Sequence, residues 1–189
     1  MELHRWVVEA GQWKEGVQAY LASISFADAM VGQLLYTLEQ TGRADETIIV
    51  LWSDHGWHLG EKHRWRKQTL WEESTRVPLI VVAPGVTTPG TRSSRAVSLV
   101  DVLPTLLELT GVDALDNLDG ASLMPLLENP DATWDRAALS TYGEGNHAVR
   151  SERYRYIRYD DGSEELYDPQ VDPGEWTNLA ADPGHANIK

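Results

Sequence analysis

Asp54 and His55 are neighbouring residues whose side chains are suited to metal binding or proton transfer. The carboxylate offers hard oxygen ligands, and the imidazole offers a nitrogen ligand or a group that carries a proton near neutral pH. Both directly follow an apolar run over residues 47–52, which is typical of a strand buried on both faces of a parallel sheet. Because binding sites form at the carboxyl edge of such sheets, we expect the two side chains to face a functional site.

A short basic run follows this pair in the sequence. Lys62, Arg64, Arg66 and Lys67 place four fixed positive charges within six residues, whereas the chain of 189 residues has a formal net charge of −13. A chain this acidic, with a sequence pI near 4.8, is not suited to binding the phosphate backbone of nucleic acids. We therefore interpret the basic run as a local anion site.

The region around the pair and the basic run resembles the sulfatase family of the alkaline-phosphatase-like superfamily of metal-dependent hydrolases. The matching residues are Ser-Asp-His-Gly-Trp at 53–57, Leu-Gly-Glu at 59–61, Trp65, Lys67, and Arg-Val-Pro-Leu-Ile at 76–80. The pattern is similar to that of iduronate-2-sulfatase-like and choline-sulfatase-like members. The resemblance implies a sulfuric ester hydrolase that acts on a sulfated small molecule or a sulfated carbohydrate.

The resemblance also implies roles for individual residues. Asp54 matches a ligand of Ca²⁺, and His55 is expected beside the metal and the nucleophile, as a metal-site and catalytic residue. Lys67 matches the lysine that contacts the sulfate, in a catalytic and substrate-binding role. His147, which follows a Gly-Asn pair, is a further candidate for substrate binding at the pocket rim. We interpret His58 as a loop residue rather than a ligand.

The sulfatase nucleophile is not found in this sequence. The family oxidises a cysteine or serine of a C-x-P-x-R or S-x-P-x-R motif to formylglycine, but the chain has no cysteine and neither motif. The other metal-binding aspartates of the family are also absent. We therefore expect the C-terminal part of a sulfatase, a fragment or truncated gene product, which has an incomplete Ca²⁺ site and is inactive alone. The formylglycine is expected upstream, in a missing N-terminal segment of the same domain.

The first 130 residues predict an α/β architecture in which helices flank a mainly parallel sheet, as in a partial alkaline-phosphatase-like domain. Apolar residues at helical spacing predict an amphipathic helix over residues 17–40. The other predicted elements are strands at 47–52 and 77–83, a short strand at 96–99, and helices at 68–73, 102–109 and 123–128.

Residues 131–189 predict a small C-terminal subdomain with an antiparallel sheet. Period-two patterns predict strands at 137–142, 147–150, 154–159 and 165–167. Arginine and tyrosine alternate over residues 153–159, which we interpret as a half-buried strand with its charged residues outward rather than as a nucleic-acid surface. Nearby acidic residues would repel phosphates.

Two other functions remain open. One is a phosphodiesterase or phosphonate-ester hydrolase of the same superfamily, and the identity of the nucleophile would distinguish it from a sulfatase. The other is a catalytically inactive domain that binds anions or a partner chain. No apolar run reaches the roughly 18 residues of a membrane span, and residues 1–16 lack a signal-peptide pattern. The resemblance implies a parent protein that is exported to a periplasmic, extracellular or lysosomal location.

Overall fold

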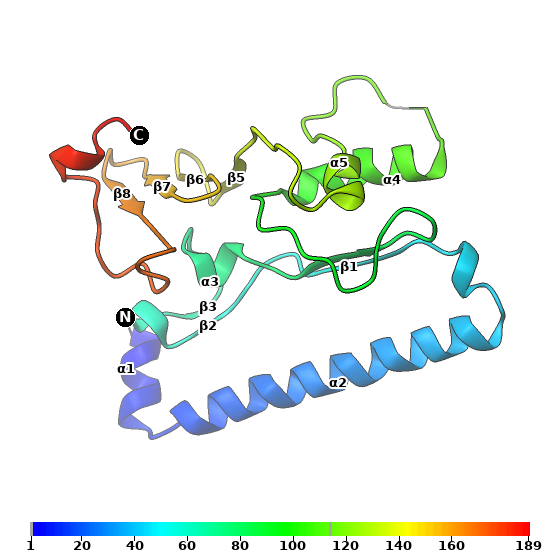
Figure 1. The fold of residues 1–189 in the computed structure, drawn as a ribbon. Coiled ribbons are helices and arrows are strands. Elements are labelled where there is room, and N and C mark those ends of the chain that lie inside the picture. The colour runs from blue at the N-terminus through cyan, green and yellow to red at the C-terminus, as the bar shows by residue number, and fades with distance from the viewer. Residues whose placement is uncertain (1, 114) are drawn as a thin grey trace.

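Two N-terminal helices open the fold of the computed structural model, which describes residues 2–113 and 115–189 (Figure 1). α1 (Glu2–Glu9) was not predicted, whereas α2 (Trp13–Gln40) contains the whole helix predicted over residues 17–40. α2 lies along one side of the molecule in Figure 1, and none of its residues is buried. The predicted helix is therefore confirmed, but its apolar stripe is only partly covered within the described chain.

The apolar character of α2 has a second consequence. Among the described residues, α2 is the one helix long and apolar enough, by length and composition alone, to cross a membrane. The core helix of a soluble protein and a signal sequence pass the same test. The absence of a membrane span stays a prediction.

β1 (Ile49–Trp52) and β4 (Leu79–Val82) form a two-stranded sheet that is antiparallel. The prediction of parallel pairing is therefore wrong for these two strands. A parallel pair needs a connection that crosses to the opposite end of the sheet. Here Trp52 pairs with Leu79, so the chain leaves and re-enters the sheet at the same end.

The connection between these strands carries the candidate site. It contains the hairpin of β2 (His58–Leu59) and β3 (Trp65–Arg66), followed by α3 (Glu72–Thr75). Its two arms are joined where the Gly56 amide donates a 2.8 Å hydrogen bond to the Ser74 carbonyl. The connection therefore folds back on itself beside the end of β1.

Two further helices, α4 (Val102–Thr110) and α5 (Met124–Glu128), agree with the predicted helices. The Asp101 carboxylate accepts bonds from the Ser98 amide at 2.8 Å and the Ala121 amide at 2.9 Å, which ties the start of α4 to the segment before α5. No strand forms at 96–99, where the chain is irregular until a 3₁₀ turn begins. The 3₁₀ turns are Ala44–Glu46, Glu61–His63, Leu99–Asp101 and Pro183–His185.

The predicted C-terminal antiparallel sheet is confirmed, with strand order β5-β6-β7-β8. Its strands are β5 (Ala138–Thr141), β6 (His147–Arg150), β7 (Arg155–Arg158) and β8 (Glu164–Tyr167). Ala148, Ile157 and Tyr167 form a hydrophobic cluster with Leu70, which comes from the connection between β1 and β4. The sheet thus packs directly against the segment that carries the candidate site. A domain boundary near residue 130 stays a prediction.

Buried charges strengthen the same contact. Arg155 is only 2% exposed and bonds to Glu175, whose side chain is fully buried, at 2.6 Å and also to Glu72 of α3. The interpretation that the arginines of residues 153–159 all point outward is therefore wrong for Arg155. It points inward because Glu175 and Glu72 supply the carboxylates that a buried guanidinium requires.

Candidate active site

The three residues predicted to act together do meet in the structure. Asp54, His55 and Lys67 all line one cavity of about 570 Å³, a size typical of small-molecule sites. The Lys67 ammonium lies 2.8 Å from Nε2 of His55, and an Asp54 carboxylate oxygen lies 3.5 Å from the same nitrogen. A carboxylate, an imidazole and an ammonium therefore share one place at the end of β1.

The hydrogen bonds of His55 define the role of each ring nitrogen. Nδ1 lies 2.8 Å from the Gly56 carbonyl oxygen, which only accepts hydrogen bonds, so Nδ1 carries a hydrogen. Nε2 is then the acceptor for the Lys67 ammonium. The lysine keeps its other N–H groups for a ligand in the cavity.

The backbone around Lys67 is in an unusual conformation. Arg66 has φ of 71° and Gln68 has φ of 78°, so a left-handed residue without a glycine's freedom stands on each side of the lysine. Such a conformation costs about 1–3 kcal/mol per residue and persists only where the surroundings enforce it. The loop is therefore held in the shape that turns Lys67 toward His55.

A buried hydrogen-bond chain anchors this loop. Nε2 of His58 lies 2.7 Å from the Thr69 hydroxyl, which donates to the Ser74 hydroxyl at 2.9 Å. His58 is fully buried, and burial lowers the pKa of its imidazole. These hydrogen bonds therefore connect β2 to α3 through Thr69, which lies two residues after Lys67, and all the groups involved are neutral.

Aromatic stacking supports the other side of the site. The indole of Trp57 stacks on the His55 imidazole with ring centres 6.3 Å apart, and on the Tyr20 ring of α2 at 6.0 Å. Because Trp57 lies between the two rings, α2 contributes to the orientation of His55.

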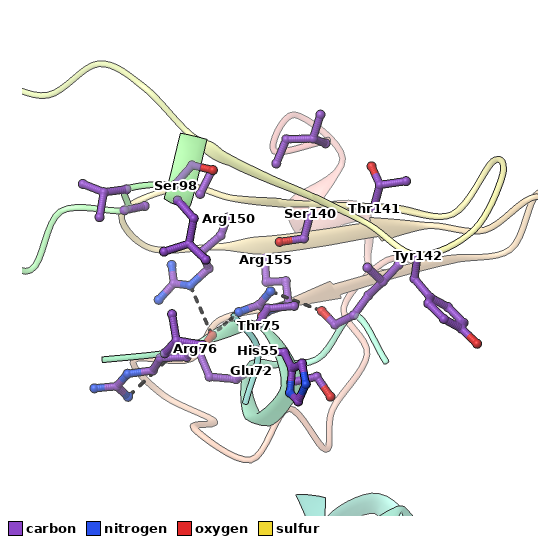
Figure 2. Close-up of a pocket in the computed structure, with 18 of the residues that line it drawn as sticks. His55, Glu72, Thr75, Arg76, Ser98, Ser140, Thr141, Tyr142, Arg150 and Arg155 are labelled. Carbon is purple, nitrogen blue, oxygen red and sulfur yellow. Dashed lines mark hydrogen bonds and ion pairs between the residues drawn. The ribbon is translucent and has the colours of Figure 1, made fainter. Parts of the chain in front are cut away.

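The remaining cations of the cavity are paired with carboxylates. Glu72 is shared by Arg155, by Arg150 at 3.5 Å and by Arg76 at 4.0 Å (Figure 2). Arg95 pairs with Glu152 at 2.6 Å. Lys67 differs from these cations because its described partner is a neutral imidazole. It is therefore the cation best placed to bind an anionic ligand.

His147 does not line the cavity of Lys67. Its side chain is exposed and lines a second, smaller cavity together with Arg158 and Asp160. Its Nδ1 lies 2.9 Å from the hydroxyl of Thr141, and Thr141 lines the cavity of Lys67. The structure therefore places His147 next to the rim but not in the cavity lining, and its role in substrate binding stays a prediction.

The described residues do not fit a calcium site by themselves. No group of three or more His, Cys, Asp or Glu side chains capable of holding a metal occurs in the part of the chain that the structure describes. Calcium takes six to eight oxygen ligands, whereas among the described residues Asp54 is the one carboxylate paired with His55, and His55 itself contacts an ammonium group. Asp54 is available as a single ligand, because its side chain is 80% exposed.

Comparison with known proteins decides the family. The sulfatase family model matches residues 5–112, and the model of the C-terminal region of N-sulphoglucosamine sulphohydrolase matches residues 60–189. The chain belongs to the sulfatase family. The predicted membership is thus confirmed by matches that together include α2, the candidate site and the C-terminal sheet.

Individual relatives show a likeness over most of the chain. A sulfatase of Formosa agariphila is 43% identical over 175 residues, which cover 93% of this chain and 34% of that protein. A solved structure described as a protein in complex with its substrate D-glucosamine-2-N,6-O-disulfate has a TM-score of 0.83 at 35% identity, covering 89% of this chain and 37% of that one. The phosphonate monoester hydrolase of Agrobacterium radiobacter has a TM-score of 0.75 at 29% identity, covering 87% and 37%.

These likenesses confirm the predicted alkaline-phosphatase-like fold in partial form. The chain spans about a third of the length of the relatives it matches.

Sequence reasoning missed several residues of the site. Thr69 and Ser74 carry no motif of their own, and the 2.7 Å contact with His58 depends on the β2–β3 hairpin, which was not predicted. Arg150 and Arg155 meet Glu72 across about 80 residues of sequence, so no local pattern reports their pairing. The strand pattern of β7 was the one available signal, because Arg155 shares a face with the apolar, buried Ile157.

Proposed function

We propose that this chain supplies the sulfate-binding corner of a sulfuric ester hydrolase. The observation that carries the proposal is the 2.8 Å contact between Lys67 and a neutral His55 at the wall of the cavity, in a chain of the sulfatase family. Hydrolysis of a sulfate ester builds negative charge on the sulfate oxygens. A fixed ammonium group that is positioned before the reaction stabilises that charge without reorganisation.

Each residue of the corner has its own part in this proposal. Lys67 binds the sulfate oxygens as a compact positive charge that presents several N–H donors. His55 holds the lysine in place through Nε2, and its imidazole is the group beside the lysine that can carry a proton. The His58–Thr69 bond keeps the lysine loop in its strained shape.

The proposed reaction also needs the Ca²⁺ ion and the formylglycine of the family, which this chain does not hold by itself. We infer that Asp54 contributes one oxygen ligand to Ca²⁺ and that the other ligands and the formylglycine nucleophile come from the part of the domain that this chain does not match. A divalent cation at this corner would neutralise the charge of the sulfate.

Exposed apolar surface supports such a complementing segment. Leu21, Phe26 and Leu34 on α2 are 55%, 68% and 69% exposed, and Trp52 and Ile80 of the β1–β4 sheet are 51% and 53% exposed. Large apolar side chains exposed in this number are typical of an interaction site. The chain also spans about a third of the length of its relatives. We propose that the segment packs on α2 and on the β1–β4 sheet.

We propose sulfated carbohydrates as the substrate class, because a relative with a TM-score of 0.83 is described in complex with a disulfated glucosamine. The alternative is a phosphonate or phosphate ester, favoured by the likeness to a phosphonate monoester hydrolase at a TM-score of 0.75. Both kinds of ester would place a tetrahedral oxyanion against the same Lys67 ammonium group, so Lys67 does not distinguish the two substrate classes.

Binding of inorganic sulfate to the purified chain tests the proposal. Calorimetric titration is expected to show sulfate binding that is lost in Lys67→Ala and kept in Lys14→Ala, a change of an exposed lysine on α2. An aryl sulfate added to the chain alone, with or without Ca²⁺, is expected to give no turnover. Sulfate binding that is equal in the two variants would refute the role of Lys67. Turnover by the chain alone would show a nucleophile within these residues.

A further inference from the structure

One wall of the cavity is the outer edge of the C-terminal sheet. β5 stands at one end of the strand order β5-β6-β7-β8, so only one of its edges is paired within the sheet. Residues 138–142 all line the cavity, together with Lys67 and His55. Figure 2 shows Ser140, Thr141 and Tyr142 in a row along this strand. The sulfate corner and the edge of β5 therefore face the same space.

The hydrogen-bond pattern indicates which backbone groups of β5 face away from β6. The Tyr142 amide donates to the Asn146 carbonyl across the β5–β6 hairpin at 3.0 Å. In an antiparallel ladder the pairing direction alternates, so the amide and carbonyl groups of Leu139 and Thr141 point to the free edge. An edge strand of this kind presents a row of donors and acceptors to a ligand.

The side chains at the end of the strand add two kinds of contact. Tyr142 is 47% exposed at the cavity and presents an aromatic ring and a phenol hydroxyl. The Thr141 hydroxyl lies 2.9 Å from Nδ1 of His147. Ring face, hydroxyl, imidazole and free backbone groups together suit a ligand that has both an apolar face and many hydroxyl groups.

We propose that the free edge of β5 with Tyr142, Thr141 and His147 is the subsite that binds the sugar ring of the substrate. A pyranose has an apolar face for the Tyr142 ring and hydroxyl groups that both donate and accept for the edge of β5. This inference rests on the proposed function, since the sulfate group would lie on Lys67 at the other wall. It also gives His147 a place in substrate binding at the rim.

The subsite is tested by titrating the isotope-labelled chain separately with inorganic sulfate and with unsulfated N-acetylglucosamine. Binding is monitored by the chemical shifts of the backbone amides. The sugar is expected to shift the amides of residues 139–142 and 147, and sulfate those of residues 55 and 67. In Tyr142→Ala the sugar affinity is expected to fall up to about tenfold while the sulfate affinity stays the same. Tyr36→Ala, which removes an exposed tyrosine of α2, is the matched control and should leave both unchanged.

The two inferences fail separately in this experiment. Sulfate shifts at residue 67 without sugar shifts on β5, or equal sugar affinity in Tyr142→Ala and Tyr36→Ala, would overturn the sugar subsite and leave the proposed function intact. Sugar shifts on β5 without any sulfate response at residue 67 would support the subsite and overturn the sulfate corner. Choline chloride is the third titrant. Stronger binding of choline than of the sugar at Tyr142 would overturn the carbohydrate assignment in favour of a quaternary ammonium ligand.

Discussion

Replacing Arg155 by methionine removes the cation on which the contact between the C-terminal sheet and α3 depends. Arg155 is 2% exposed and bonds to Glu175, to Glu72 and, at 3.2 Å, to the Leu70 carbonyl. Methionine keeps much of the side-chain volume but no positive charge. The variant therefore leaves the fully buried Glu175 carboxylate without its partner.

The size of the effect follows from this burial. Removing one member of a buried ion pair costs about 3–5 kcal/mol, because the remaining charge is desolvated without compensation. Burial already raises the pKa of Glu175, and Arg155 opposes that rise. In Arg155→Met the carboxyl will therefore take up a proton more readily, so the loss of stability should be smaller at acidic pH than at alkaline pH.

Urea unfolding followed by tryptophan fluorescence measures this loss. Arg158→Met is the matched control, because Arg158 lies on the same strand with its side chain exposed, and it should change the free energy of unfolding by less than about 0.5 kcal/mol. The double variant Arg155→Met/Glu175→Gln should recover part of the loss, since the unpaired charge is gone. A cost for Arg155→Met that equals the cost for Arg158→Met would refute the reasoning.

Three other predictions concern the lysine loop and the metal. Burial lowers the pKa of His58 below its usual value of 6.5, so the unfolded chain binds the proton more tightly than the folded chain. The free energy of unfolding should therefore fall as the pH drops from 6.5 toward the folded pKa. His58→Gln should weaken this pH dependence, measured by urea unfolding at several pH values. An unchanged pH dependence would contradict the buried, neutral His58. Gly56→Ala would place a Cβ atom against the Glu73 carbonyl oxygen and should lower the free energy of unfolding by about 1–3 kcal/mol or more. Gly32→Ala is the control, because a Cβ atom there meets open space on α2, and it should leave stability unchanged or raise it. Equal urea midpoints for the two variants would refute the close approach at Gly56. Calcium should bind the chain alone no more tightly than about 10⁻⁴ M by calorimetry, since Asp54 is one ligand of the six to eight required; tighter binding that is lost in Asp54→Asn would show a complete site.

Local patterns predicted the elements well where one face of the chain is apolar. The helix over 17–40 and the four C-terminal strands occur within a few residues of their predicted bounds. The meeting of Asp54, His55 and Lys67 also followed from sequence, because a strand end and a returning loop bring such residues together. Element type and the site corner were thus accessible from periodicity and motif spacing.

Long-range pairing was not accessible in the same way. The antiparallel order of β1 and β4 depends on where the 26-residue connection returns, and apolar runs carry no sign of that direction. The bond between Arg155 and Glu72 joins residues 83 positions apart, and arginine on a strand normally faces water. Only the packed structure shows which charged residue is the buried one.

Restoring the unmatched part of the domain tests the central claim most directly. The first two thirds of the Formosa agariphila sulfatase, fused ahead of this chain at the start of the match and produced in cells that form formylglycine, should release sulfate from an aryl sulfate faster than it hydrolyses the corresponding phosphonate ester. Lys67→Ala in this fusion should lower kcat/KM about 100-fold or more, and Lys14→Ala should not change it. Activity that survives Lys67→Ala within a few-fold, or faster turnover of the phosphonate ester, would contradict the account.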